Sequence, residues 1–139
     1  MEVSKQTKIA MWIFTFLAMA FFIVDTRGAF IHLRTEPWTN HAMFHAVTGL
    51  FYTQALCVIV LILTWIPFKK GQLWSWWTIM LIGETIHGGH LIGDIMTDGG
   101  LRGGGTAQGP GMIFYSLTAV ALLLYLAGLA LSRKHFRQT

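Results

Sequence analysis

Long apolar runs separated by short polar stretches dominate the chain. These runs cover residues of about 9–31, 41–68, 73–96 and 111–132. A membrane-spanning helix needs about 20 mostly apolar residues, and each run reaches that length. The first run follows Lys5 and Lys8, but it is too long for a secretory signal and no small-residue cleavage site follows it. The pattern therefore predicts an all-α, integral membrane four-helix bundle in a single domain.

Basic residues lie at the edges of the apolar runs and predict how the bundle is oriented. One side of the predicted bundle carries seven of them: Lys5, Lys8, Lys69, Lys70, Arg133, Lys134 and Arg137. The opposite side carries only Arg27, Arg34 and Arg102. Cytoplasmic loops are enriched in Lys and Arg, so both termini are expected in the cytoplasm. We expect a multi-pass protein of the bacterial inner membrane.

Composition and charge exclude several other classes of protein. The chain is 54% hydrophobic and only 12% charged, whereas soluble domains carry about 25% charged residues. This balance excludes a disordered chain and an ordinary cytosolic enzyme. The net charge of +4 is spread over the edges of the apolar runs, so no nucleic-acid partner is expected. The single cysteine, Cys57, cannot form an internal disulfide.

Ionisable residues inside the predicted spans belong to the first three runs and the loop that follows the first. They are Asp25, His32, His41, His45, Glu84, His87, His90 and Asp94. The topology places all of them in the outer half of the bilayer. Burying such groups costs several kcal/mol unless they are paired, hydrated or bound to metal, so we expect them to point into the bundle.

The spacing of these residues predicts shared helix faces. At about 100° per residue, Glu84, His87, His90 and Asp94 fall within an arc of roughly 120° on the third helix. His41 and His45, four residues apart, share a face of the second helix in the same way. On the other side of the third helix, Gly89 and Gly93 form a pair of small residues suited to close helix packing.

Histidines at these spacings are typical of metal coordination, because both rings of a pair project from one face. Residues 84–87 also read E-x-x-H, a unit that di-iron bundles use twice and that occurs here once. The predicted site binds a transition metal (Cu, Fe or Zn). Its expected ligands are His41, His45, His87 and His90, completed by Glu84 or Asp94.

The leading functional hypothesis is a metal-dependent oxidoreductase that acts on a lipophilic substrate entering from the bilayer. In this hypothesis Asp25, His32 and Glu84 carry protons or support the metal ligands. A first alternative is a b-type haem held between His45 and His87. A second is a metal-independent lipid or sterol-type isomerase or binding protein that uses Asp25, Glu84 and His87. A third is a small accessory or cofactor-holding subunit of a larger membrane complex, and a homo-oligomer is also compatible with the sequence.

The stretch from Asp25 to His45 carries a recognisable motif. Its core reads His32-x5-Trp38-x2-His41-Ala42-x-Phe44-His45. This motif resembles the signature of a family of small four-helix membrane proteins that has no assigned activity. The resemblance implies that His32, Trp38, His41 and His45 act as one unit. The helix count and the placement of Asp25 and Glu84 are also similar, more weakly, to the sterol-isomerase-like superfamily.

Overall fold

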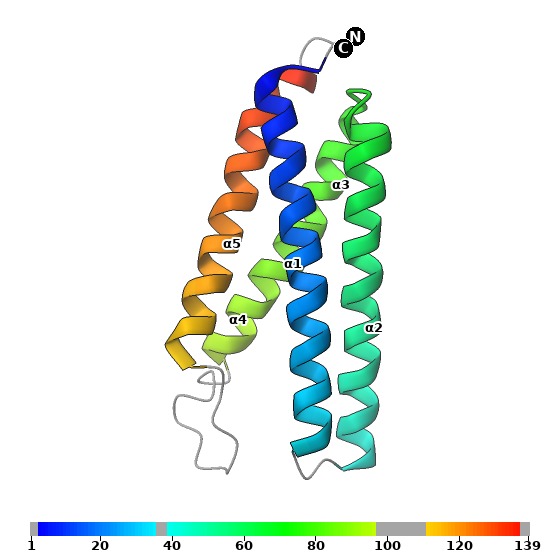
Figure 1. Ribbon diagram of the computed structural model, residues 1–139, viewed down its shortest axis with the longest axis vertical. Helices are drawn as coiled ribbons and strands as arrows, with labels where there is room; N and C mark the ends of the chain where they lie inside the picture. The colour runs from blue at the N-terminus through cyan, green and yellow to red at the C-terminus, as the bar shows by residue number, and fades with distance from the viewer. Residues whose placement is uncertain (1–2, 36–38, 97–110, 137–139) are drawn as a thin grey trace.

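The computed structural model describes residues 3–35, 39–96 and 111–136 of the chain, which form four long helical segments (Figure 1). The first is α1 (Lys5–Thr35), and the second is α2 (Asn40–Leu63) continued by the π-helical turn η1 (Thr64–Phe68). The third joins α3 (Leu73–Gly83) to α4 (Gly89–Met96) through a second π-helical turn, η2 (Glu84–Gly88). The fourth is α5 (Gly111–Ser132), which ends in the 3₁₀ turn η4 (Arg133–Phe136). The prediction of an all-helical fold is confirmed for these residues, which include no strand.

The turn between the second and third segments depends on Gly71. Its φ is 76°, in the left-handed region that residues with a side chain rarely adopt. The backbone N–H of Gly71 donates to the Phe68 carbonyl at 2.9 Å. The N–H of Gln72 donates to the Pro67 carbonyl at 3.1 Å. These bonds satisfy carbonyls left free at the helix end, and the chain reverses within a few residues.

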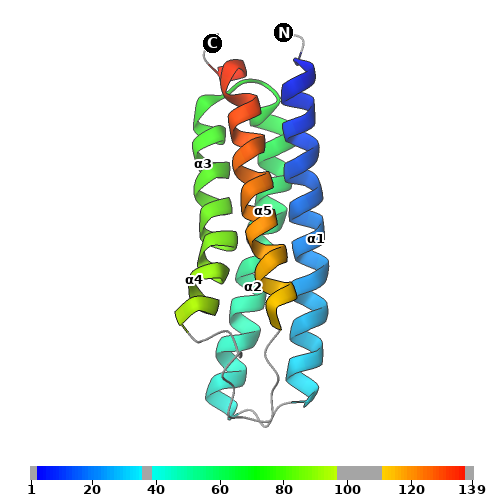
Figure 2. The ribbon, with the colours of Figure 1, turned by 90° about the vertical axis from the view of Figure 1, so that its left-hand side faces the viewer.

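Both chain ends and the turn at Gly71 lie at the same end of the bundle, which we call the terminal end (Figures 1 and 2). The opposite end, where α1 ends and α2 begins, is the far end. Six described basic residues belong to the terminal end: Lys5, Lys8, Lys69, Lys70, Arg133 and Lys134. Arg27 and Arg34 lie in the far part of α1. The arrangement therefore gathers most of the positive charge at one end.

The core is centred on Phe14, which is fully buried. Its ring packs against Phe68 with centroids 5.5 Å apart and against Tyr125 with centroids 5.0 Å apart. Phe68 continues this aromatic cluster to Phe136 at the terminal end, at 4.8 Å. Residues from α1, η1, α5 and η4 thus share one aromatic core.

Two glycines allow the helices to approach within this core. A Cβ added to Gly83 would clash with the Tyr125 ring, and one added to Gly128 would lie 2.8 Å from the Phe14 ring. Among the described residues, no atom lies within 4 Å of a Cβ built at Gly89, so the close packing predicted for Gly89 and Gly93 is not seen there. The surroundings of Gly93 lie outside what the structure describes. Close packing occurs at Gly83, on the side of the third segment that faces α5.

The outer surface of the bundle is apolar. Exposed large hydrophobic side chains outnumber the buried ones, and Trp12, Phe16, Leu81 and Leu123 are each more than 60% exposed. Within the part of the chain that the structure describes, three helices are long and apolar enough to cross a membrane: Lys5–Ile31, Met43–Phe68 and Ser116–Phe136. An exposed apolar surface of this extent would be unusual in a water-soluble protein.

Candidate functional site

The two predicted histidine pairs lie at different levels of the bundle. At 1.5 Å rise per residue, His90 lies about 25 Å from the start of α3. Counted back from Phe68, His45 lies about 35 Å and His41 about 41 Å from the terminal end. Figures 1 and 2 show the reason: α1 and the start of α2 extend beyond the ends of α4 and α5 at the far end. The pairs are therefore separated along the bundle axis.

The pair on α2 is a close contact between two exposed side chains. His41 Nε2 and His45 Nε2 are 3.1 Å apart, and the rings meet edge to face with centroids separated by 4.5 Å. Phe44 packs beside His45 at 5.5 Å. This contact confirms the predicted shared face of His41 and His45.

Glu84 does not share a face with His87, contrary to the sequence-based expectation. Its side chain is exposed, whereas that of His87 is only 3% exposed. The expectation assumed a regular α-helix, but residues 84–88 form a π-helical turn. A π turn takes more residues per revolution than an α turn, so the three-residue spacing separates the two side chains by a wider angle. Such turns occur frequently at functional sites.

His87 is the most enclosed of the predicted site residues that the structure describes. Its ring packs edge to face on Phe21, with centroids 5.2 Å apart, and contacts Tyr125 at 5.5 Å. The ring nitrogen Nδ1 is buried and has no hydrogen-bond partner among the described residues. Buried polar atoms in folded proteins are nearly always hydrogen-bonded, so we expect this nitrogen to bind a group outside the described residues.

His90 also packs edge to face on Phe21, with centroids 4.9 Å apart, so the same phenyl ring contacts two imidazoles. Its Nδ1 lies 2.8 Å from the Ile86 carbonyl. A carbonyl only accepts, so Nδ1 carries the hydrogen and donates it. Nε2 of His90 is then the nitrogen available for other contacts. His90 also interacts electrostatically with the half-buried Asp25 on α1.

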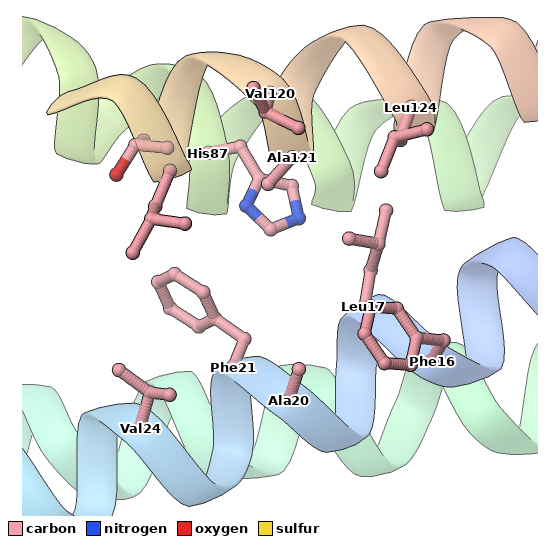
Figure 3. A pocket seen from close by; sticks show the side chains of 11 residues that line it. Phe16, Leu17, Ala20, Phe21, Val24, His87, Val120, Ala121 and Leu124 are labelled. Atoms are coloured by element: carbon pink, nitrogen blue, oxygen red, sulfur yellow. The ribbon is translucent and has the colours of Figure 1, made fainter. Parts of the chain in front are cut away.

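A pocket of about 240 Å³ lies between α1 and α5 beside His87 (Figure 3). Figure 3 shows the His87 ring directed into this space, opposite Phe21 and among aliphatic side chains. The lining is otherwise almost entirely apolar: Phe16, Leu17, Ala20, Phe21, Val24, Leu117, Thr118, Val120, Ala121 and Leu124. Phe16, Leu117 and Val120 are more than half exposed, so the pocket opens sideways onto the outer surface of the bundle.

Behind His87, on the side of α2, lies a much smaller void of about 10 Å³. It is bounded by residues that include Cys57, Gly83 and Tyr125. A cavity needs about 10–15 Å³ to hold one water, so this void lies at the lower limit for a single water molecule. The α1–α5 pocket is the larger space beside His87.

The predicted site residues therefore form separate groups. His87 and His90 contact Phe21, and Asp25 interacts electrostatically with His90. His41 and His45 form a pair nearer the far end, and Glu84 is exposed. The described residues contain no group of three or more His, Cys, Asp or Glu side chains placed to hold one metal ion. The side chains of His32 and Asp94, and the whole of Trp38, lie outside the described residues.

Sequence reasoning missed the pocket itself. Its lining residues are apolar side chains typical of any membrane helix, so their identities carry no chemical signal. The interhelical hydrogen bond from Gln54 Nε2 to Thr26 Oγ1, at 2.7 Å, was also not anticipated. Uncharged polar residues within an apolar run, such as Thr26 and Gln54, are the signal for such a bond. Inside a membrane these side chains form hydrogen bonds with residues of neighbouring helices.

No family model, curated protein or solved structure matches this chain. The resemblance of residues 25–45 to a family of small four-helix membrane proteins therefore stays a prediction. The functional argument depends on the geometry around His87.

Proposed function

We propose that the chain is a four-span integral membrane protein that binds a lipophilic molecule in the α1–α5 pocket. In this proposal His87 contacts a hydroxyl or carbonyl group of the bound molecule. The observation that carries the proposal is a nearly fully buried histidine, with an unpartnered ring nitrogen, that lines an apolar pocket. Ligand pockets typically combine an apolar lining with few polar groups that fix the ligand's orientation.

Membrane insertion is supported by the apolar outer surface and by the distribution of charge. Six described basic residues gather at the terminal end, in keeping with cytoplasmic termini. Exposed tryptophans lie near the same end: Trp12, Trp65, Trp74 and Trp77. Tryptophan is enriched where a membrane meets water, so this arrangement favours an interface at that level.

The route into the pocket favours a ligand from the bilayer. The pocket opens between the exposed side chains Phe16, Leu117 and Val120, which would face acyl chains. Its volume is below the roughly 300–1,000 Å³ typical of sites for drug-sized molecules. A narrow linear apolar group with one oxygen, such as a fatty or isoprenoid alcohol, therefore fits it better than a fused-ring sterol.

Binding is better supported than the alternative of acid–base isomerisation. Of the predicted acid–base residues, only His87 lines the pocket, whereas Glu84 faces away from it. General acid–base catalysis needs each group within hydrogen-bond reach of the reacting atom. The metal-dependent oxidoreductase and the b-type haem protein remain predictions, and no contact among the described residues favours either over lipid binding.

A photoreactive long-chain alcohol tests the proposal. The purified protein, reconstituted in bilayers, is irradiated with a diazirine-bearing hexadecanol, and the labelled peptides are identified by mass spectrometry. We expect labelling on α1 and α5 around Phe21 and Ala121. Ala121→Trp fills the pocket and should abolish this labelling, whereas Ala127→Trp, on the exposed side of α5, should preserve it.

The role of His87 is tested with a second probe that lacks the hydroxyl group. A hydrogen bond contributes about 1 kcal/mol, so His87→Leu should weaken binding of the alcohol about five-fold. It should leave binding of the matching hydrocarbon unchanged. Equal labelling of the Ala121→Trp and Ala127→Trp variants would contradict the pocket, and equal effects of His87→Leu on both probes would contradict the polar contact.

A further inference from the structure

The first turns of α2 bring two histidine rings together at the far end of the bundle. Both side chains are exposed, and Nε2 of His41 lies 3.1 Å from Nε2 of His45. The two residues are four apart on a regular α-helix, so their rings project from the same face. The lining of the α1–α5 pocket includes neither residue. The contact between the two rings therefore needs an explanation of its own.

The separation of the two nitrogens is that of two ligands of one metal ion. Imidazole nitrogens bind a transition metal at about 2.0–2.1 Å. Because the two Nε2 atoms are 3.1 Å apart, an ion at that distance from both would subtend an N–metal–N angle of about 100°. This angle lies between the roughly 90° of a tetragonal site and the roughly 109° of a tetrahedral one. One ion can therefore contact both nitrogens without movement of the backbone.

Neighbouring side chains restrict the positions of the two rings. The ring planes of His41 and His45 are inclined at 84°, with centroids separated by 4.5 Å. Phe44 packs edge to face on the His45 ring, at 5.5 Å and 72°. These contacts limit the rotamers of His45, so a bound ion has less side-chain freedom to remove. The pair is therefore partly preorganised for chelation.

A hydrogen bond between the two imidazoles is the simplest alternative. It requires that one Nε2 carries a hydrogen and that the other accepts it. Both side chains are exposed, so water competes for the same nitrogens and the bond contributes little to stability. Metal binding instead uses the lone pairs of both Nε2 atoms, with the hydrogen of each ring on Nδ1. The two arrangements differ in how the pair responds to a cation, so an experiment can separate them.

The position of the pair along α2 allows ions from water to reach it. α2 begins at Asn40, whereas the part that could cross a membrane begins at Met43 (Figure 1). His41 precedes that part, and His45 lies in its first turn. If the chain spans the membrane as proposed, the pair lies at the edge of the bilayer opposite the basic terminal end. An exposed pair at that level meets dissolved ions and leaves the remaining coordination positions to water.

We propose that His41 and His45 chelate a divalent transition-metal ion through their Nε2 atoms. Two histidines four apart on one helix face also hold zinc in the H-E-x-x-H helices of metalloproteases, where a third protein ligand completes the site. Imidazole nitrogens suit Cu²⁺, Ni²⁺ and Zn²⁺, and the affinity of such sites is greatest for Cu²⁺. Mg²⁺ and Ca²⁺ prefer oxygen ligands and are not expected to bind. The α2 pair thus binds an ion without the histidines of the third segment.

Metal titration of the full chain tests the proposal. The protein is expressed without a histidine tag, purified in detergent and titrated with Cu²⁺ or Zn²⁺ in a calorimeter. We expect one ion to bind to the pair, more tightly as Cu²⁺ than as Zn²⁺, and no binding of Mg²⁺. His45→Ala removes one ligand and should weaken binding by more than about ten-fold, since loss of a group that only supports a ligand already costs that much. Adding His41→Ala should weaken binding no further, because neither imidazole chelates alone.

A register variant controls for nonspecific binding by surface histidines. His45→Ala combined with Ala46→His keeps the number of histidines on α2 but turns the second ring by about 100° around the helix. It should bind no better than His45→Ala alone. His90→Ala, at a histidine on α4, should bind the ion as tightly as the wild type. A register variant that binds like the wild type would show that the ion is held nonspecifically, and would overturn the proposal.

Electron paramagnetic resonance of the Cu²⁺-loaded protein identifies the ligands. The spectrum of the wild type should show coupling to two imidazole nitrogens, and that of His45→Ala should show coupling to fewer. Circular dichroism checks that each variant keeps its helices, as expected for substitutions at exposed positions. A wild type that binds no ion, or a His45→Ala variant that binds as tightly as the wild type, would mean that the contact is a hydrogen bond and would overturn the proposal.

The outcomes also separate this inference from the proposed lipid binding. The chelating pair and the α1–α5 pocket share no residue. Protein that labels with the alcohol probe but binds no ion refutes only the metal site. Protein that binds the ion through both histidines but does not label refutes only the lipid pocket.

Discussion

The terminal half of the bundle and the far half are packed in different ways. Among the side chains that the structure describes, the buried apolar ones belong to the terminal half. On α1 they extend only to Ala18, on α2 they begin at Cys57, and on α5 they begin at Tyr125. In the far half, the described side chains of α1 and α2 are half or fully exposed, and the two histidine pairs and Asp25 lie there or at its border. Stability is therefore concentrated near the termini, and polar groups gather where packing is looser.

The largest expected contrast between the halves is at two phenylalanines. Phe14→Ala removes a fully buried ring from the terminal core and should lower the free energy of unfolding by about 3–5 kcal/mol. Phe44→Ala, at a side chain that is 64% exposed in the far half, should change it by less than about 0.5 kcal/mol. Reversible unfolding in mixed detergent micelles, followed by circular dichroism, measures both. Equal losses would mean that the far half carries as much of the stability as the core.

Two glycines on the third segment provide a sharper version of the same test. Gly83→Ala places a methyl group against the Tyr125 ring and should destabilise the fold by about 1–3 kcal/mol. Gly89→Ala has open space and should not destabilise the monomer, because alanine also favours the helix. Both are read from the same unfolding curves, at high detergent so that association does not contribute. A larger loss from Gly89→Ala would show that its surroundings are packed within the monomer.

The smallest expected effect is at the polar contact that joins α1 and α2 in the far half. Gln54 donates to Thr26, whose own hydroxyl donates to the Phe22 carbonyl. A double-mutant cycle with Gln54→Leu and Thr26→Val should give a coupling energy of about 0.6 kcal/mol, the average for hydrogen bonds between membrane helices. A coupling near zero would indicate that the two helices are held together in the far half by apolar contact alone.

Much of the fold follows from the pattern of the chain. The predicted runs 9–31, 41–68, 73–96 and 111–132 match the four helical segments to within a few residues at most ends. The shared face of His41 and His45 was also predicted correctly, because both lie on a regular α-helix. These features depend on local periodicity, which a sequence displays directly.

The arrangement of the candidate site was less predictable, for two physical reasons. The π turn at Glu84–Gly88 changes the phase of the third segment, so the assumed 100° per residue fails where the chemistry is concentrated. The helices also differ in length, so residues assigned to one level of the bundle, such as His45 and His90, are separated along its axis. Neither feature is visible in the spacing of the histidines.

The sequence by itself determined the helical class, the segment boundaries and the apolar outer surface, because these depend on composition and on hydrophobic runs that each segment carries alone. Only the tertiary structure decided which polar groups meet. His87 is buried beside a pocket because α1 and α5 pack around it, and Glu84 faces outward because one wide turn rotates it away. Such contacts depend on the relative rotation and length of neighbouring helices, which no single segment encodes.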